Sequence, residues 1–284
     1  IGGDSINAIQ ISSKLNERGF TLKIQDIISN PTIEAMAGCM KANEKSHIDQ
    51  SICEGYVKPS PITAWFFVQE FGNLNHYNQS IILKLKQDIK VEKLEIALNA
   101  LIKHHDTLRL NYDKKMKRLF YNHAHLERNY KIYVYDFSDL PQSEQEDKIS
   151  QASVKLKGDF DIEKNILIKA CYFNLGDNGC KVLLTAHHLI VDGVSWRILI
   201  QDIYTAFKQI QSGQPVQLPD KTHSYQEWAE KVNEYSCEIC QDKEQYWKTY
   251  IDRTIEFSEK HKSVEKISGQ GKTLTIKLEV ENTA

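Results

Sequence analysis

The sequence predicts an α/β protein, because segments with helical spacing of apolar residues alternate with short apolar runs of strand type. The chain has 284 residues, of which 41% are hydrophobic. It can therefore bury a core, and its length corresponds to about two domains. No internal repeat or low-complexity tract interrupts the alternation. We expect an α/β sandwich preceded by a shorter helical segment.

The expected elements follow in order along the chain. Two helices are predicted at 5–18 and 32–42, joined by a loop, and a mostly polar linker is predicted at 43–58. Pro61 opens a short helix. Further helices are expected at 91–101, at 142–156 and after residue 193, and a long one carries Trp228, Val232, Tyr235 and Ile239. Strands are expected at 81–85, 107–112, 117–121, 130–136, 166–173, 181–187 and 272–280.

The charge balance excludes some classes of partner. The chain carries 36 basic and 38 acidic residues, with no dense basic run, which argues against nucleic acid as a partner. No apolar stretch reaches the ~18 residues that span a bilayer, and no charged and then apolar signal sequence begins the chain. We therefore expect a cytoplasmic protein without a membrane partner.

The cysteines and most of the histidines do not form a metal pattern. Six cysteines in a chain of this length indicate free thiols. Cys237 and Cys240 form a CxxC pair inside a helical pattern, without a second pair at zinc spacing. The pairs 104–105 and 123–125 contain histidines but lack a spaced third ligand. We expect no metal site.

A pair of histidines stands at the most informative place in the chain. His187 and His188 follow the apolar run 182–186, and Asp192 and Gly193 come just before a helical pattern. An imidazole at a strand end can be oriented by its neighbours, and its ordinary pKa suits general acid–base chemistry. The alternative is a pair of ordinary strand-end histidines, but the strand, loop and helix context favours a catalytic base.

A second pattern begins the chain. Gly2 and Gly3 precede Ser5, which starts a predicted helix. Glycines leave a turn accessible, and a serine at a helix start exposes its hydroxyl. The alternative is a simple serine cap after a glycine-rich turn. The apolar stripe of the helix is supplied by Ile6, Ile9, Ile11 and Leu15.

Several ordered motifs resemble one family. HHLIVDG at 187–193 resembles the HHxxxDG motif of the condensation superfamily of nonribosomal peptide synthetases, whose members share a chloramphenicol-acetyltransferase-like fold. PITAWFF at 61–67 resembles the opening motif of that family, with Thr63 in place of the usual Gln. Asn-Gln-Ser at 78–80 and HDTLR at 105–109 match further motifs. The resemblance implies an α/β sandwich lobe of this fold.

Two segments resemble the epimerization branch of the superfamily. They are VSWRIL at 194–199 and SYQEWA at 224–229. At the N-terminus, GGDSI resembles the attachment site of a peptidyl carrier protein, which implies a covalent 4′-phosphopantetheine on Ser5. The resemblance therefore predicts a partial carrier domain at 1–42, a linker at 43–58 and the N-terminal lobe of an epimerization domain at 59–284. On this interpretation the chain is a fragment of a megasynthase.

The resemblance also implies a reaction. The substrate would be an aminoacyl or peptidyl thioester on a carrier domain, whose α-hydrogen is acidic enough for a well-placed base. His188 would act on one face of the α-carbon, and a glutamate of a second lobe on the other. We expect L to D epimerization, and expect this fragment alone to be inactive. The alternatives are a condensation domain that forms a peptide bond and a non-catalytic scaffold for carrier docking.

Further partners and roles are expected from the same resemblance and from the residues. The partners are a phosphopantetheinyl transferase, an upstream adenylation domain and a downstream condensation domain. We expect His187 to hold the loop by hydrogen bonding and Gly193 to permit a tight turn. Asp192 is expected to brace the loop by hydrogen bonds or by a salt bridge with an arginine, and Arg109 is one candidate for that arginine. Amides at the start of the following helix are candidates for stabilising developing negative charge.

Two tryptophans near these motifs have an open role. Trp65 and Trp196 could line a channel or pack in the core. For an aromatic residue in an apolar run, the core is the expected place.

Overall fold

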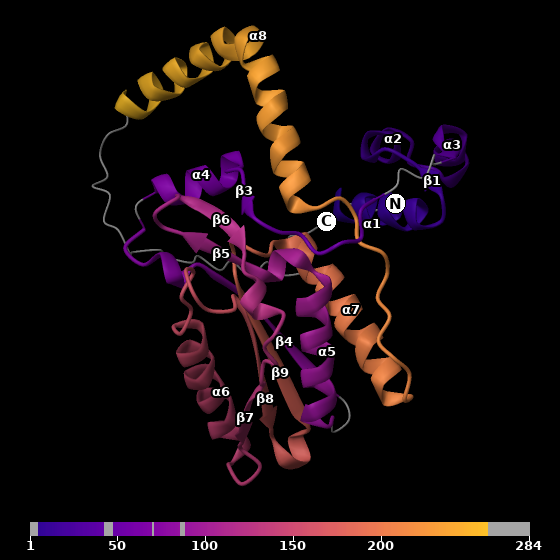
Figure 1. Cartoon of the computed structure of the whole chain (residues 1–284), viewed down its shortest axis with the longest axis vertical. Coiled ribbons are helices and arrows are strands. Elements are labelled where there is room, and N and C mark those ends of the chain that lie inside the picture. The colour runs from indigo at the N-terminus through magenta and orange to yellow at the C-terminus, as the bar shows by residue number, and fades with distance from the viewer. Residues whose placement is uncertain (1–4, 43–47, 70, 86–88, 261–284) are drawn as a thin grey trace, which may run out of the picture. The chain divides into compact units, whose positions relative to one another are not determined.

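The computed structural model describes residues 5–42, 48–69, 71–85 and 89–260 (Figure 1). It confirms the α/β class. The chain forms two units, residues 1–233 and the residues from 234 onward, and each is described by itself. The predicted strand at 272–280 lies outside the described residues.

The N-terminal segment is a small helical body with its own core. Helices α1 (Ser5–Glu17), α2 (Ile24–Ser29) and α3 (Ile33–Cys39) are accompanied by two short antiparallel strands, β1 (Phe20–Thr21) and β2 (Lys41–Ala42). Its buried core consists of Ala8, Leu22 and Ile27. The sequence predicted a loop where α2 lies, because a helix of six residues is too short to show a helical period.

A four-stranded sheet forms the centre of the α/β body. Its strand order is β4 (Asn78–Leu85), β9 (Cys180–His187), β8 (Ile168–Asn174) and β7 (Tyr133–Asp136). β9 is antiparallel to both neighbours, and β7 runs parallel to β8. β8 and β9 are buried on both faces, which explains their mostly apolar sequences.

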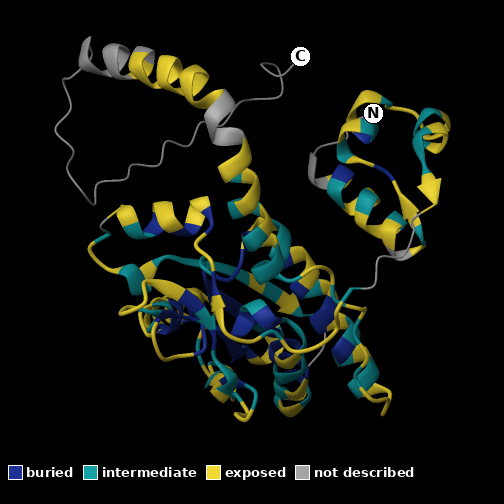
Figure 2. Cartoon of the chain, turned by 45° about the horizontal axis from the view of Figure 1, so that its top comes forward, coloured by how far each residue is buried: buried dark blue, intermediate teal, exposed yellow. Residues whose placement is uncertain are grey.

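Helices cover both faces of this sheet. α6 (Gln142–Lys157) packs on one face, where Ile149 and Leu156 meet Phe173 and Leu183. α5 (Val91–His104) and α7 (Gly193–Gln211) pack on the other face and against each other (Figure 1). Alternate strand residues therefore enter two different cores. Figure 2 shows the buried residues gathered in this sheet and in the facing sides of its helices.

A second, smaller sheet holds the short strands. It has the order β3 (Tyr56–Val57), β6 (Arg118–Tyr121) and β5 (Leu110–Asp113), and all pairs are antiparallel. The end of the segment predicted as linker thus pairs with β6. Helix α4 (Pro61–Val68) follows β3, with Ser60 as its N-cap. Four 3₁₀ turns complete the described body: η1 (Leu74–His76), η2 (Asp106–Arg109), η3 (His123–His125) and η4 (Gly176–Asn178).

The strand predicted at 107–112 is only half correct. Its first part is the 3₁₀ turn η2, and only the part from Leu110 is a strand. Arg109 is buried and donates from Nη1 to the carbonyl oxygens of Ile102 and Lys103, at 2.6 and 2.8 Å. These carbonyls end α5, so the chain must turn back tightly to satisfy them.

The last described element is the long helix α8 (Tyr225–Lys260). In the first unit, Ala229 of this helix is fully buried in the main core. In the second unit, the helix carries exposed aromatic residues, namely Tyr235, Tyr246, Trp247 and Tyr250.

Candidate active site

The two histidines lie where β9 leaves the central sheet. His187 is the last residue of β9, and α7 begins at Gly193, so five residues connect the strand to the helix. The backbone N–H of His188 donates to the carbonyl oxygen of Tyr77, at 2.8 Å, just before β4 begins. The connection is therefore anchored to the neighbouring strand at its first residue.

His187 is bonded on both ring nitrogens and has no access to solvent. Its Nε2 donates to the carbonyl oxygen of Leu74, at 2.7 Å, and its Nδ1 accepts from the N–H of Leu189, at 3.1 Å. Burial lowers the pKa of His187 to about 4, so the ring is neutral. These contacts are those of a side chain that holds the loop.

His188 has a different environment. Its Nδ1 lies 2.8 Å from the carbonyl oxygen of Val191, which can only accept, so Nδ1 carries the proton. Its Nε2 lies 2.9 Å from Nε2 of Gln79 and accepts a hydrogen bond from that amide. The ring of Tyr77 stacks on the imidazole, with centroids 5.3 Å apart. In this arrangement the basic lone pair of the ring is on Nε2.

Asp192 is the N-cap of α7. Its Oδ1 accepts from the N–H groups of Val194 and Ser195 and from the Ser195 hydroxyl, at 3.0, 2.7 and 2.7 Å. Burial acts to raise the pKa of Asp192, but the hydrogen bonds from Ser195 and Val194 outweigh it and the pKa is lowered. The hydrogen bonds of the Asp192 side chain thus go to the first turn of α7.

Three expectations about this helix start are wrong. Arg109 does not pair with Asp192, because its guanidinium bonds to Asp106, which also accepts from Lys221. The amides of Val194 and Ser195, in the first turn of α7, are engaged by the Asp192 carboxylate and are not available for a substrate oxygen. Gly193 has no positive φ and has open space where a Cβ would lie, so no tight turn requires glycine there.

A cavity of about 300 Å³ adjoins His188. Its walls come from α4, from the turn before β4, from β5, from the histidine loop and from the start of α8. Most of them are apolar, and His188 contributes the imidazole. The lining residues are Ile62, Thr63, Trp65, Phe66, Tyr77, Thr107, Leu110, His188, Leu189, Ile190, Val191, Asp192, Ser195 and Tyr225.

The tryptophans and Thr63 occupy distinct places around this cavity. Trp196 is 6% exposed and packs in the core, as expected, whereas Trp65 is 47% exposed and lines the cavity. Thr63 stands where the family motif usually has Gln. Its hydroxyl donates to the carbonyl oxygen of Ser60, at 2.9 Å. Ser60 in turn bonds to the Tyr225 hydroxyl, which joins α4 to the first turn of α8.

Gln79 is the member of this site that sequence reasoning missed. It was recognised only as part of a motif, with no role assigned. Its side-chain Oε1 accepts from the indole N–H of Trp196, at 3.0 Å, while its Nε2 donates to His188. Since Gln79 lies on β4 and Trp196 on α7, no local spacing connects them to His188.

Ser5 is the first residue of α1, as expected for an attachment serine. A helix start suits a phosphodiester at this position, because its free N–H groups and dipole favour negative charge.

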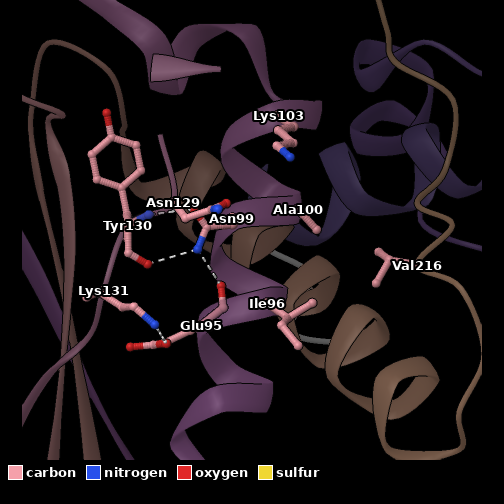
Figure 3. Close-up of a pocket in the computed structure, with 9 residues that line it drawn as sticks. All are labelled: Glu95, Ile96, Asn99, Ala100, Lys103, Asn129, Tyr130, Lys131 and Val216. Atoms are coloured by element: carbon pink, nitrogen blue, oxygen red, sulfur yellow. Dashed lines mark hydrogen bonds and ion pairs between the residues drawn. The ribbon is translucent and has the colours of Figure 1, made fainter. Parts of the chain in front are cut away.

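A second cavity, about 460 Å³, lies elsewhere along α5 (Figure 3). It shares no lining residue with the histidine cavity. Its polar groups bond to each other: the Asn99 amide donates to carbonyl oxygens of Glu95 and Tyr130, and Lys131 pairs with Glu95 at 2.9 Å. No imidazole or thiol lines it, so it offers no catalytic base or nucleophile of these kinds.

In the described part of the chain, no three His, Cys, Asp or Glu residues are grouped so as to hold a metal ion. Within the same residues, no helix combines the length and apolar character that crossing a membrane requires.

The chain belongs to the Condensation domain family, which matches residues 56–284. Residues 1–40 match the Phosphopantetheine attachment site family. A carrier segment followed by a condensation-superfamily domain is an arrangement of nonribosomal peptide synthetases, and 4′-phosphopantetheine is the covalent cofactor of such a carrier. The recognition of both parts from their motifs is thereby confirmed.

The curated relatives are large synthetases. The whole chain is 34% identical to part of surfactin synthase subunit 1 of Bacillus subtilis (strain 168), and 87% of it is 33% identical to part of gramicidin S synthase 1 of Brevibacillus brevis. The matches cover 8% and 22% of these two proteins, so the chain spans a small part of their length.

Solved structures agree with the fold. The epimerization domain from the third module of tyrocidine synthetase B is 28% identical, with a TM-score of 0.66, over 72% of this chain and 45% of that one. A variant of the starter condensation domain of rhizomide synthetase is 16% identical, with a TM-score of 0.56, over 69% of this chain and 48% of that one. This confirms the chloramphenicol-acetyltransferase-like fold, which condensation and epimerization domains share.

Proposed function

We propose that this chain takes part in L to D epimerization of an aminoacyl or peptidyl thioester held on a carrier domain. The observation that carries the proposal is the set of contacts made by His188. Nδ1 lies 2.8 Å from the Val191 carbonyl oxygen, which can only accept, so the basic lone pair is on Nε2, where it accepts from the Gln79 amide. The imidazole lines a largely apolar cavity. A general base needs this combination of a lone pair and access to the substrate.

In the proposed reaction, His188 takes a proton from the α-carbon of the thioester. The α-carbon hydrogen of the thioester passes to His188 Nε2, and the electrons of the C–H bond move toward the thioester carbonyl. A proton from an acid on the opposite face of the α-carbon, for which we propose the glutamate of a second lobe, completes the inversion. His188 then loses its Nε2 proton to solvent, and the acid is protonated again from solvent. The phosphopantetheine arm supplies the thioester and its reach. We propose Ser5 as the attachment residue and residues 1–42, 43–58 and 59–284 as carrier, linker and epimerization lobe.

The likeness to the tyrocidine synthetase epimerization domain supports this subtype, together with the VSWRIL and SYQEWA segments. The second candidate function is peptide-bond formation, which the match to the Condensation domain family favours. In that reaction the same Nε2 would take a proton from the attacking amine. The substrate thioester, an upstream adenylation domain, a downstream condensation domain and a phosphopantetheinyl transferase are the partners that both reactions imply.

The test is His188→Ala in the whole polypeptide that carries this chain. We expect L to D conversion to fall by about a hundredfold or more, because a general acid–base group is lost. Chiral analysis of the released residue and deuterium uptake at its α-carbon measure the conversion. His223→Ala is the matched control, since His223 is exposed and does not line the cavity.

The outcomes separate the candidates. Epimerization at the wild-type rate in His188→Ala would remove this residue from the mechanism. Peptide-bond formation by the unmodified protein without inversion or deuterium uptake would assign it to the condensation class. Carrier binding with neither reaction would leave the scaffold.

A further inference from the structure

We propose that Gln79 and Trp196 are positioning residues that keep His188 neutral, with its lone pair on Nε2. This inference rests on the proposed function for its catalytic meaning, but its structural content can be tested separately. The three side chains come from β4, α7 and the loop after β9. They form one chain of hydrogen bonds that ends on the Val191 carbonyl.

The chemistry of the groups determines the donor in each of these three hydrogen bonds. The Trp196 indole can only donate, so Gln79 Oε1 is its acceptor, at 3.0 Å. The Gln79 amide nitrogen is therefore the atom that faces His188, and it can only donate, at 2.9 Å. The Val191 carbonyl can only accept from Nδ1, at 2.8 Å. Both ends of the chain thus specify the same tautomer.

The Trp196 indole determines which end of the Gln79 amide faces His188. A glutamine amide can turn over and offer oxygen in place of nitrogen, and an amide oxygen would favour a protonated His188. In this structure such a turn would place the Gln79 NH₂ group against the indole N–H, donor against donor. Trp196 is buried in the core and belongs to the first turn of α7, whose start is capped by Asp192. The indole therefore holds Gln79 as a donor toward His188.

The hydrogen bond from Gln79 affects proton transfer at Nε2 of His188. Nε2 has one lone pair in the ring plane, and the Gln79 amide occupies it until a substrate hydrogen competes for it. Once Nε2 has taken a proton, two N–H groups face each other, which disfavours the protonated ring. Gln79 therefore favours both the neutral base before reaction and loss of the Nε2 proton from His188 to solvent afterwards.

Other titratable groups near His188 do not duplicate this effect. On the same loop, His187 is neutral. The Asp192 carboxylate, which accepts from the Val194 and Ser195 amides through Oδ1, attracts a protonated His188 and so acts against Gln79. Tyr77, from the turn before β4, stacks on the ring, and Tyr225 of α8 lines the cavity. The part of α4 that lines the cavity carries no ionisable group. Gln79 is the side chain bonded to Nε2.

The first experiment reads the tautomer directly, without activity. The 284-residue chain is labelled with ¹⁵N-histidine, and the His188 signals are identified by their loss in His188→Gln. We expect a protonated Nδ1 and an unprotonated Nε2 near neutral pH. In Gln79→Glu, whose carboxylate accepts from Nε2–H, the ring should stay protonated to a pH higher by about one unit or more. Gln201→Glu, which adds the same charge on an exposed position of α7, should leave the His188 titration in place.

The second experiment uses epimerization. In Gln79→Glu, the acidic limb of the pH–rate profile should move to higher pH, because more alkaline solution is needed to obtain the neutral base. Trp196→Phe removes the indole N–H and frees the amide to turn, so it should shift the limb in the same direction by less. In both variants kcat should fall while KM stays near the wild-type value. Circular dichroism and urea unfolding check that each variant is folded.

Two results would overturn the inference. One is a wild-type His188 that carries its proton on Nε2. The other is a folded Gln79→Glu variant whose His188 titrates as in the wild type. The proposed function fails separately: the nitrogen signals would behave as expected, while His188→Ala still epimerizes.

Discussion

His187 and His188 are adjacent in the sequence, but their side chains have opposite environments. His187 is fully buried, with both ring nitrogens bonded to backbone groups. His188 borders the cavity and uses Nδ1 for the backbone and Nε2 for a side chain. Successive side chains at the end of a strand point to opposite sides, which explains the contrast. The motif thus combines a residue that holds the loop with a candidate base.

His187 provides a first prediction. His187→Leu should lower the free energy of unfolding by about 1–3 kcal/mol for each backbone group left without a partner, since the Leu74 carbonyl and the Leu189 N–H both lose theirs. Urea unfolding followed by circular dichroism measures the change. His223→Leu, on an exposed position, should be close to neutral. Equal stability of His187→Leu and the wild type would mean that these hydrogen bonds do not hold the loop.

Ser5 provides a second prediction at the same scale. Incubation of the whole polypeptide with coenzyme A and a phosphopantetheinyl transferase should add one phosphopantetheine mass to the peptide that contains Ser5. Ser5→Ala should abolish the addition, because the hydroxyl is the acceptor. Ser13→Ala, on an exposed position of the same helix, should keep it. Unchanged labelling of Ser5→Ala would remove this residue from the carrier role.

At the scale of elements, α7 begins at the candidate site because Asp192 caps it. The carboxylate satisfies two of the free N–H groups of the first turn. The cap fixes the position of Trp196, four residues further on, and through it the Gln79 amide. The conspicuous Asp of the motif therefore acts first on the geometry of a helix.

Two substitutions separate this capping role from a chemical one. Asp192→Ala should lower the free energy of unfolding by about 1 kcal/mol, because the cap is lost, whereas Asp192→Asn should change it little, since Asn is an equally good cap. Epimerization should follow the same order, with Asn close to the wild type. A stable Asp192→Asn variant that no longer epimerizes would instead show that the carboxylate charge is needed.

The boundaries of an element could be predicted where their cause lies in neighbouring residues. The helices at 142–156 and after residue 193 were predicted well, because apolar residues recur along their whole length. The turn η2 was predicted as strand, since its cause is a bond from Arg109 back to the end of α5. Neighbouring residues carry no trace of such a contact.

At the scale of the molecule, the core of the α/β body contains neutral histidines that make folding sensitive to acid. His125 is buried, bonded to Asn111 and Tyr130, and burial lowers its pKa to about 4, with Arg128 and Arg109 adding to the effect. The pKa of His187 is lowered to about 4 as well. Both histidines therefore resist protonation in the folded state more than in the unfolded chain.

Because the pKa values of both histidines are lowered by folding, the free energy of unfolding should fall as the pH falls. The unfolded chain binds protons at these histidines as the pH falls below about 6.5, while the folded protein does so only near 4. The stability that neutral His125 and His187 contribute should be complete above pH 6.5 and lost between 6.5 and 4. Each unit of pKa difference corresponds to about 1.4 kcal/mol.

Urea unfolding at pH 7.5, 6 and 5 tests this. Stability should fall steadily over the series, and His125→Asn should flatten the dependence, because one of the two histidines no longer titrates. His223→Ala, which removes an exposed histidine, should leave the slope unchanged. A stability that is constant from pH 7.5 to 5 would contradict the buried neutral state.

The sequence by itself determined the α/β class, most helices and strands, and the two families, because apolar periodicity and compact motifs are properties of neighbouring residues. Only the tertiary structure decided the partners of the polar side chains. Arg109 bonds to Asp106 rather than Asp192, and Gln79 stands between His188 and Trp196. A hydrogen bond requires atoms within about 3 Å. Strands and helices distant in the chain reach that separation only when the sheet and its helices have packed.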